Sequence, residues 1–158
     1  MQKITPFLWF KDRNAEEAMN YYVDAFPNSK VHSVTRYPDD MQVGPHSDMA
    51  GLVLTGVFEL AGQTFYCIDG GPEFSFNEAI SLYVSCKDQA EVDYFWEKLS
   101  AVPDAEACGW CKDKFGVSWQ IIPENMGDLI SSPQAVQKML RMKKIIISEL
   151  EAAGSASE

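Results

Sequence analysis

The chain is poor in positive charge. Its 158 residues include 13 lysines and arginines against 23 aspartates and glutamates, which gives a net charge of −10 at pH 7. Nucleic-acid backbones and anionic membranes bind positively charged surfaces, so this balance argues against either as a partner. The sequence also lacks an apolar run of the roughly 20 residues that a membrane-spanning helix needs. Because its first residues do not have the layout of a signal peptide, we expect a cytoplasmic protein.

Histidine and cysteine, the usual ligands of structural zinc, are also scarce. His32 and His46 are isolated, and two of the four cysteines form the pair Cys108-x-x-Cys111. Redox motifs and zinc sites use that spacing, but here it falls in an expected strand, where residues three apart face opposite sides. We therefore expect ordinary reduced cysteines. A redox or zinc role is the less favoured alternative.

What the chain does contain is a clear β-hairpin over residues 108–123. Its second strand alternates, with Val117, Trp119 and Ile121 on one side and a hydroxyl and an amide, Ser118 and Gln120, on the other. Gly116 provides the turn with a residue that tolerates a positive φ. This pattern predicts a core on one side of the strand and a cavity lining on the other.

The same pattern occurs 54 positions earlier, with Gly62 in the place of Gly116 and Tyr66 in the place of Gln120. A second echo relates residues 4–12 to residues 80–88, and both copies continue into Ala-Glu and a helical pattern. Two echoes in the same order indicate an internal duplication. The repeated unit reads as a strand, a helix and then a run of strands.

These signals predict an α+β protein with a single domain over residues 1–158. Unit one spans 1–70, with a helix capped by Asp12 or Asn14, and unit two spans 77–125. A turn-rich stretch over 38–50 is expected to form a mobile loop at a cavity mouth. Ser132 and Pro133 give a helix start signal, and we expect one C-terminal helix over 133–152.

Strand parity places polar and aromatic residues together on the side of each sheet away from the helices. Such a mixture is typical of a pocket for a small, partly apolar ligand. A packing face or a dimer interface is the alternative, because interfaces are also rich in aromatic residues. The residues expected to line the pocket are Thr5, Phe7, Trp9, Thr64, Tyr66, Ser81, Tyr83, Ser118 and Gln120.

Three motifs carry a resemblance to a known family. They are ITPFLWF at 4–10, GGPxFxFNxAxS at 70–81 and DKFGVSWQIIP at 113–123. Together they resemble the PhnB-like branch of the vicinal oxygen chelate superfamily, whose members are often labelled demethylubiquinone methyltransferase. The superfamily includes glyoxalase I, extradiol dioxygenases and bleomycin-resistance proteins. The resemblance implies two tandem βαβββ units that form a cupped mixed sheet, as in the glyoxalase and bleomycin-resistance fold.

The resemblance also implies where a metal would bind. The superfamily's metal enzymes place four ligands, usually His and Glu, at positions that correspond to Thr5, Tyr66, Ser81 and Gln120. Divalent metals favour imidazole, carboxylate or thiolate over hydroxyl and amide groups, so we expect no tightly held metal and no cofactor. The sequence also has no glycine-rich strand–helix turn that would bind the nucleotide part of a methyl donor.

Three hypotheses for the function follow. The first is a metal-free homodimer that binds a small organic molecule in its cups. The second is an enzyme of the superfamily, a lyase, isomerase or transferase on a small metabolite, with Tyr66 as its best acid or base. The third is a metal enzyme with ligands outside the usual quartet, such as Glu59, His46 or Asp69.

Overall fold

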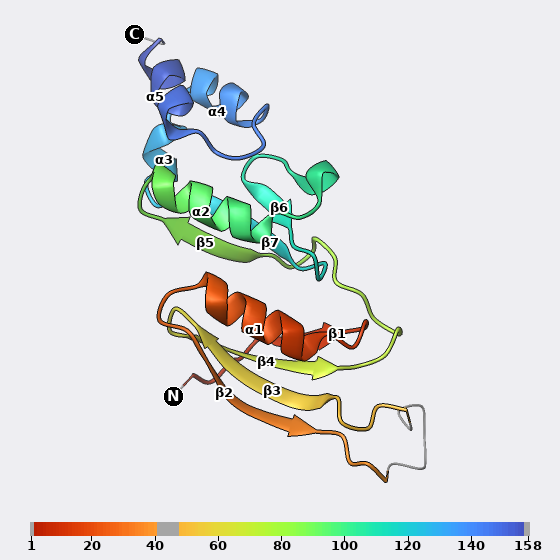
Figure 1. Ribbon diagram of the computed structural model, residues 1–158. Coiled ribbons are helices and arrows are strands. Elements are labelled where there is room, and N and C mark those ends of the chain that lie inside the picture. The colour runs from red at the N-terminus through yellow and green to blue at the C-terminus, as the bar shows by residue number, and fades with distance from the viewer. Residues whose placement is uncertain (1, 41–47, 157–158) are drawn as a thin grey trace. The chain divides into compact units, whose positions relative to one another are not determined.

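A computed structural model describes residues 2–40 and 48–156. The chain divides into two units, Met1–Phe76 and Asn77–Glu158, and each unit is described here by itself. Each has its own sheet with a helix across one face (Figure 1). The α+β class predicted from the sequence is therefore confirmed. Residues 41–47 of the expected loop at 38–50 lie outside the described part of the chain.

The first unit has the predicted βαβββ order. Its sheet is arranged β1-β4-β3-β2, with β1 and β4 parallel and the other pairs antiparallel. The first and last strands of the unit are thus neighbours. The elements are β1 (Phe7–Phe10), α1 (Ala15–Ala25), β2 (Lys30–Arg36), β3 (Val53–Leu60) and β4 (Gln63–Asp69).

The core of the first unit lies between α1 and the sheet. Met19 and Tyr22, spaced on one side of the helix, are fully buried, and so is Phe58 of β3. The Tyr22 and Phe58 rings stack with centroids 6.4 Å apart, and Phe58 stacks in turn on Phe65 of β4 at 5.4 Å. Alternate residues of β3 and β4 therefore face α1, which leaves the others for the opposite side.

A buried carboxylate joins three elements of the first unit. Asp69, at the end of β4, accepts hydrogen bonds from the backbone N–H of Ala15 and of Val53, each at 2.9 Å. Ala15 is the first residue of α1, so Asp69 satisfies a donor that the start of a helix leaves unpaired. The predicted capping side chain is thus wrong, because Asn14 occupies the cap position without a side-chain cap bond.

The second unit repeats the plan with one strand fewer among its described residues. Its sheet is arranged β5-β7-β6, and β5 and β7 are parallel. A short 3₁₀ helix and a loop occupy the place that β2 has in the first unit. The elements are β5 (Leu82–Cys86), α2 (Gln89–Leu99), η1 (Pro103–Ala105), β6 (Trp110–Lys112) and β7 (Ser118–Pro123).

The β6–β7 turn is organised by a second buried carboxylate. Asp113 accepts hydrogen bonds from the backbone N–H of Phe115 and Val117, and from Trp119 Nε1 at 2.8 Å. Gly116 has a φ of 93°, as the sequence predicted. The turn therefore fixes the start of β7 and the direction of its side chains.

The C-terminal region differs from the single helix expected over 133–152. It contains α3 (Met126–Leu129), α4 (Pro133–Met139) and α5 (Ile147–Ser155), and the predicted start at Ser132 and Pro133 is correct. The helix breaks because the carbonyls of Met142 and Lys143 accept hydrogen bonds from Cys108 and Gly109, each at 2.8 Å. Ile145, between the two helices, is fully buried. Tertiary pairing overrides helix propensity in this segment.

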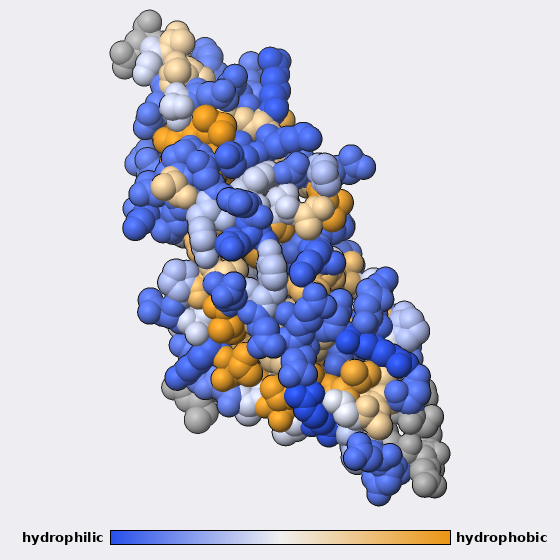
Figure 2. All heavy atoms as spheres, viewed as in Figure 1, coloured by the Kyte–Doolittle hydropathy of each residue, from blue (hydrophilic) through white to orange (hydrophobic). Residues whose placement is uncertain are grey.

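Hydrophobic residues reach the surface in separate patches surrounded by hydrophilic ones (Figure 2). One such patch lies over the C-terminal helices of the second unit. A cluster of buried residues joins β7 to α3 and α5: Ile122, Leu129, Met142, Ile145 and Leu150. None of the described helices is long and apolar enough to cross a membrane.

Replacement of Asp69 by Ala is expected to lower the free energy of unfolding by about 3 kcal/mol, because two buried N–H groups lose their acceptor. Urea denaturation followed by tryptophan fluorescence measures the effect. Asp24→Ala, on the exposed side of α1, is the matched control and should change stability by less than about 0.5 kcal/mol. Equal stabilities of the two variants would contradict the capping role.

Candidate functional site

The side of each sheet away from α1 or α2, here called the opposite face, carries the side chains that the sequence predicted for a pocket. In the first unit Phe7 and Tyr66 are direct neighbours across the parallel β1–β4 pair. Their rings meet edge to face with centroids 5.9 Å apart. Phe7 is 52% exposed and Tyr66 36% exposed. This aromatic pair provides an exposed apolar surface for a ligand.

Trp9 lies on the same face but is held by the segment that follows β4. Its Nε1–H donates to the carbonyl of Gly71 at 2.9 Å, and its ring meets Phe74 at 4.9 Å. A side chain at Gly70 would overlap the indole, so only glycine allows this approach. Trp9 therefore anchors the chain after β4 and is less available to a ligand than Phe7.

Thr5 and Thr64 are connected by Gln2. Gln2 Nε2 donates to Thr5 Oγ1 at 3.3 Å and to the carbonyl of Thr64 at 3.1 Å, and Gln2 Oε1 accepts from Thr64 N–H at 3.2 Å. The glutamine thus holds the residues before β1 against β4. Both threonines lie in the first unit as predicted, and the Thr5 hydroxyl already takes part in a hydrogen bond.

In the second unit an amide lies between two aromatic side chains. Gln120 of β7 is the partner of Tyr83 on β5 and of Trp110 on β6, so the three side chains form a row across the sheet. Gln120 Nε2 donates to Ser81 Oγ at 2.9 Å. The amide oxygen and the flanking rings are arranged to contact a molecule with a flat part and a polar group.

Ser118 is the next residue of β7 on this face. Its hydroxyl is buried, and among the described residues it has no hydrogen-bond partner. Across the β6–β7 pair it faces Lys112, whose ammonium pairs with Glu78. A buried hydroxyl without a partner is unfavourable, so this position favours a ligand or water that supplies one.

Sequence reasoning missed two parts of these faces. Trp110 was not predicted, because the 54-residue echo aligns Cys111 with Val57. In the structure Val57 pairs with Tyr66, and the equivalent partner of Gln120 is Trp110. The longer β6–β7 turn shifts the alignment by one residue. An ion pair between His32 and Glu59 was also missed, since its two residues are far apart in sequence.

The alternative metal ligands considered from the sequence, Glu59, His46 and Asp69, all belong to the first unit. Among the described residues no three His, Cys, Asp or Glu side chains are grouped to hold a metal ion. Asp69 uses both oxygens for backbone N–H groups, and Glu59 binds His32. His46 lies outside the described residues. The expectation that no metal is tightly bound stays a prediction.

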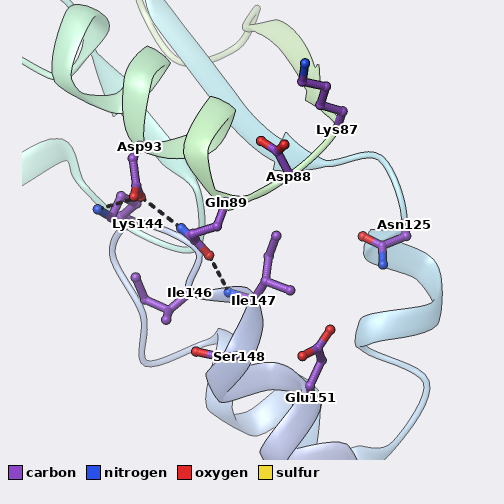
Figure 3. Close-up of a pocket in the computed structure, with 10 residues that line it drawn as sticks. All are labelled: Lys87, Asp88, Gln89, Asp93, Asn125, Lys144, Ile146, Ile147, Ser148 and Glu151. Atoms are coloured by element: carbon purple, nitrogen blue, oxygen red, sulfur yellow. Dashed lines mark hydrogen bonds and ion pairs between the residues drawn. The ribbon is translucent and has the colours of Figure 1, made fainter.

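A hollow of about 470 Å³ lies in the second unit, between the starts of α2 and α5 (Figure 3). Gln89 crosses it: Nε2 donates to the carbonyl of Ile145 and to Asp93, each at 2.9 Å, and Oε1 accepts from Ile147 N–H at 2.8 Å. Asp93 also pairs with Lys144 at 2.8 Å. These bonds hold the C-terminal helices, so we assign this hollow a structural role.

Comparison with known proteins gives the family. The family model described as 3-demethylubiquinone-9 3-methyltransferase matches residues 2–122. The chain belongs to this PhnB-like family. No curated protein matches it. A PhnB protein from Bacillus cereus has 40% sequence identity, over 77% of this chain and 99% of that one, with a TM-score of 0.62.

Two more distant structures share the fold of this PhnB-like chain. A Pseudomonas aeruginosa protein is 18% identical, over 78% of this chain and 98% of that one, with a TM-score of 0.58. An Arabidopsis thaliana gene product is 20% identical, over 77% of this chain and 98% of that one, with a TM-score of 0.50. At these identities the likeness concerns the fold alone.

The family's description names a methyltransferase, and the described residues do not fit the nucleotide part of a methyl donor. Such a group is commonly bound by a glycine-rich turn that leads from a strand into a helix. Among the described residues, the turns from a strand into a helix are Lys-Asp-Arg-Asn before α1, Lys-Asp before α2 and Glu-Asn before α3, and none contains glycine. At the starts of α1 and α2 a carboxylate, Asp69 or Asp88, accepts a backbone N–H.

The four cysteines are free, as the sequence predicted. Burial raises the pKa of Cys67, Cys86 and Cys111 to about 12. Cys108 lies just before β6 with a φ of 53°, so the predicted strand position of this cysteine is wrong, and it is only partly buried. Because the thiolate is the reactive form, the buried three should be inert at neutral pH.

Replacement of Gln89 by Ala should lower the free energy of unfolding by about 1–2 kcal/mol, since the partly buried backbone groups of Ile145 and Ile147 lose their hydrogen bonds. Amide hydrogen exchange should become faster at Ile147. Gln137→Ala, on the exposed side of α4, is the control and should leave both properties unchanged. Unaltered exchange in Gln89→Ala would refute the structural role of this side chain.

With a thiol-specific disulfide reagent at pH 8, we expect Cys108 to react first. A thiol with a pKa of about 12 is ionised in only about one molecule in 10,000 at that pH. The buried cysteines should therefore react with the reagent only after the protein unfolds. Cys108→Ser should remove the fast phase. A Cys108–Cys111 disulfide in native protein, detected by non-reducing peptide mapping, would contradict this assignment.

Proposed function

We propose that this PhnB-like protein binds a small organic molecule on the opposite face of each sheet, taken by itself. The molecule has a flat apolar part and at least one hydrogen-bonding group. The observation that carries the proposal is the row of Tyr83, Gln120 and Trp110, which puts an amide between two aromatic side chains. A ligand that stacks on the rings can hydrogen-bond the amide without a change of strand geometry.

The surroundings of Gln120 support an oriented amide. Its Nε2 donates to Ser81 Oγ at 2.9 Å, which directs the amide oxygen to the remaining positions of the face. The Ser118 hydroxyl, two residues earlier on β7, is buried and has no partner among the described residues.

The duplicated unit provides a related surface. Phe7 and Tyr66 occupy the register positions that Tyr83 and Gln120 occupy in the second unit. The first unit thus presents two rings where the second presents a ring and an amide. We infer that a ligand on the first face makes mainly apolar contacts, whereas a ligand on the second face also hydrogen-bonds the amide.

We further propose that the protein acts in the cytoplasm as a homodimer. Large apolar side chains on both units are exposed, among them Phe7, Phe74, Ile80 and Tyr83. Exposed apolar surface is a liability for a monomer and is commonly covered by a ligand or by a second subunit. Ligand binding and assembly can be separated by measuring both on the same variants.

Saturation-transfer NMR with benzamide and benzoate tests the binding site. Each probe combines a flat ring with one polar group. Tyr83→Ala should weaken binding about fivefold through lost ring contact, and Gln120→Leu should weaken benzamide binding by a similar factor. Tyr94→Ala, an exposed tyrosine on α2, is the matched control and should bind both probes as the parent does.

Light scattering on the same samples reports the oligomeric state. We expect a dimer for the parent and for all three variants, at tens of micromolar protein. Unchanged probe affinity in both Tyr83→Ala and Gln120→Leu would overturn the binding site. If Tyr83→Ala instead becomes monomeric, the second unit's opposite face is the subunit interface.

A further inference from the structure

His32 occupies an irregular position at the outer strand of the first sheet. Val31 is paired with Phe58, and Ser33 is paired with the adjacent residue Val57, so β2 has one extra residue here. That residue is His32. A β-bulge re-aims the side chain of its extra residue and is common next to active sites.

The imidazole of His32 is directed at a carboxylate. His32 Nε2 and Glu59 Oε2 are 2.9 Å apart, and both side chains are partly exposed. A carboxylate accepts only, so Nε2 donates in this contact, and in the neutral form of the ring the lone pair is on Nδ1. This is the arrangement of a general base that is oriented by a carboxylate.

A cation lies in the same row of the sheet. Lys30 is the direct partner of Glu59 across the β2–β3 pair, and Thr64 is the partner of Glu59 on the other side. Directly opposed residues have Cβ atoms roughly 5 Å apart, so the lysine ammonium can reach the vicinity of the dyad. Among the described residues, Glu59 pairs with His32 and Lys30 is the charged neighbour of Glu59 on β2.

The dyad lies one row from the aromatic pair of the first unit. Tyr66 is opposite Val57, two residues from Glu59 along β3, and Phe7 is beside Tyr66. Diagonal neighbours on one face are about 7–8 Å apart, which is within reach of a small molecule. One face thus combines a base, a cation and an apolar platform.

We propose that His32 and Glu59 form a general-base dyad that enolises a small 2-oxo acid. Lys30 binds the carboxylate of the substrate. His32 Nδ1 removes a proton from C3, the electron pair of the broken C–H bond forms the C2–C3 double bond, and the C2 oxygen takes a proton from solvent. The product is the enol, an isomer of the substrate. Glu59 is a positioning residue that stabilises the imidazolium.

Deuterium exchange at C3 of pyruvate in D₂O, followed by proton NMR, tests the dyad by itself. The parent protein should accelerate exchange above the buffer rate, and His32→Ala should remove that acceleration. Glu59→Gln should reduce it about tenfold and shift its pH profile. Lys30→Met should raise the half-saturating pyruvate concentration several-fold while the maximal rate is retained.

The matched control variants make the same kind of charge-removing substitution at exposed positions in a turn and on a helix, away from the dyad. Lys11→Met and Glu97→Gln should exchange pyruvate as fast as the parent does. Nitrogen NMR should find the Nε2–H tautomer of His32 in the parent and a mixture of tautomers in Glu59→Gln. No acceleration by the parent, or full acceleration by His32→Ala, would overturn the proposal whatever the tautomer.

The aromatic part of the inference rests on the proposed ligand-binding function and has its own arm. With 4-phenyl-2-oxobutanoate, Phe7→Ala should raise the half-saturating concentration about fivefold, and it should leave pyruvate exchange unchanged. If Phe7→Ala does not change the half-saturating concentration of 4-phenyl-2-oxobutanoate, the aromatic contact is refuted and the proposal for the dyad is unaffected. If the parent protein does not accelerate pyruvate exchange but still binds the aromatic probes, the dyad is refuted and the proposed ligand binding is unaffected.

Discussion

Each unit depends on a parallel pairing between its first and last strands. β1 pairs with β4, and β5 pairs with β7, although more than 30 residues separate the paired strands. Parallel neighbours require a crossover, and α1 and α2 supply it on one side of each sheet. The other side is left for residues such as Phe7 and Tyr66, which become neighbours only through this pairing.

Two buried carboxylates stabilise the strand pairing. Because their oxygens already accept hydrogen bonds, they have little capacity to bind a metal or a substrate. Asp69 connects the end of β4 to the starts of α1 and β3, and Asp113 fixes the turn before β7. An aspartate whose oxygens accept backbone N–H groups has little capacity left for a metal or a substrate. Reactive groups in this fold are therefore to be found among partly exposed residues such as His32 and Gln120.

Much of this arrangement could be predicted from the sequence. The echo of Gly62 and Tyr66 in Gly116 and Gln120 revealed the duplication, and strand parity gave the correct side for Tyr83. What failed depends on contacts that sequence periodicity does not encode. One extra turn residue displaced Trp110 in the alignment, a bulge re-aimed His32, and backbone bonds from Cys108 and Gly109 interrupted the C-terminal helix.

The loop that replaces a strand in the second unit also governs self-association. Ala101 N–H donates to the carbonyl of Lys112 and Ala107 N–H to that of Trp110, so backbone groups along the outer edge of β6 are already paired. At the outer edge of the first sheet, β2 carries the bulge at His32 and the charges of Lys30 and Arg36. Unpaired, regular edges recruit strands from other molecules into aggregates. The edges at β2 and β6 are thereby poor templates for added strands, for different reasons in the two units.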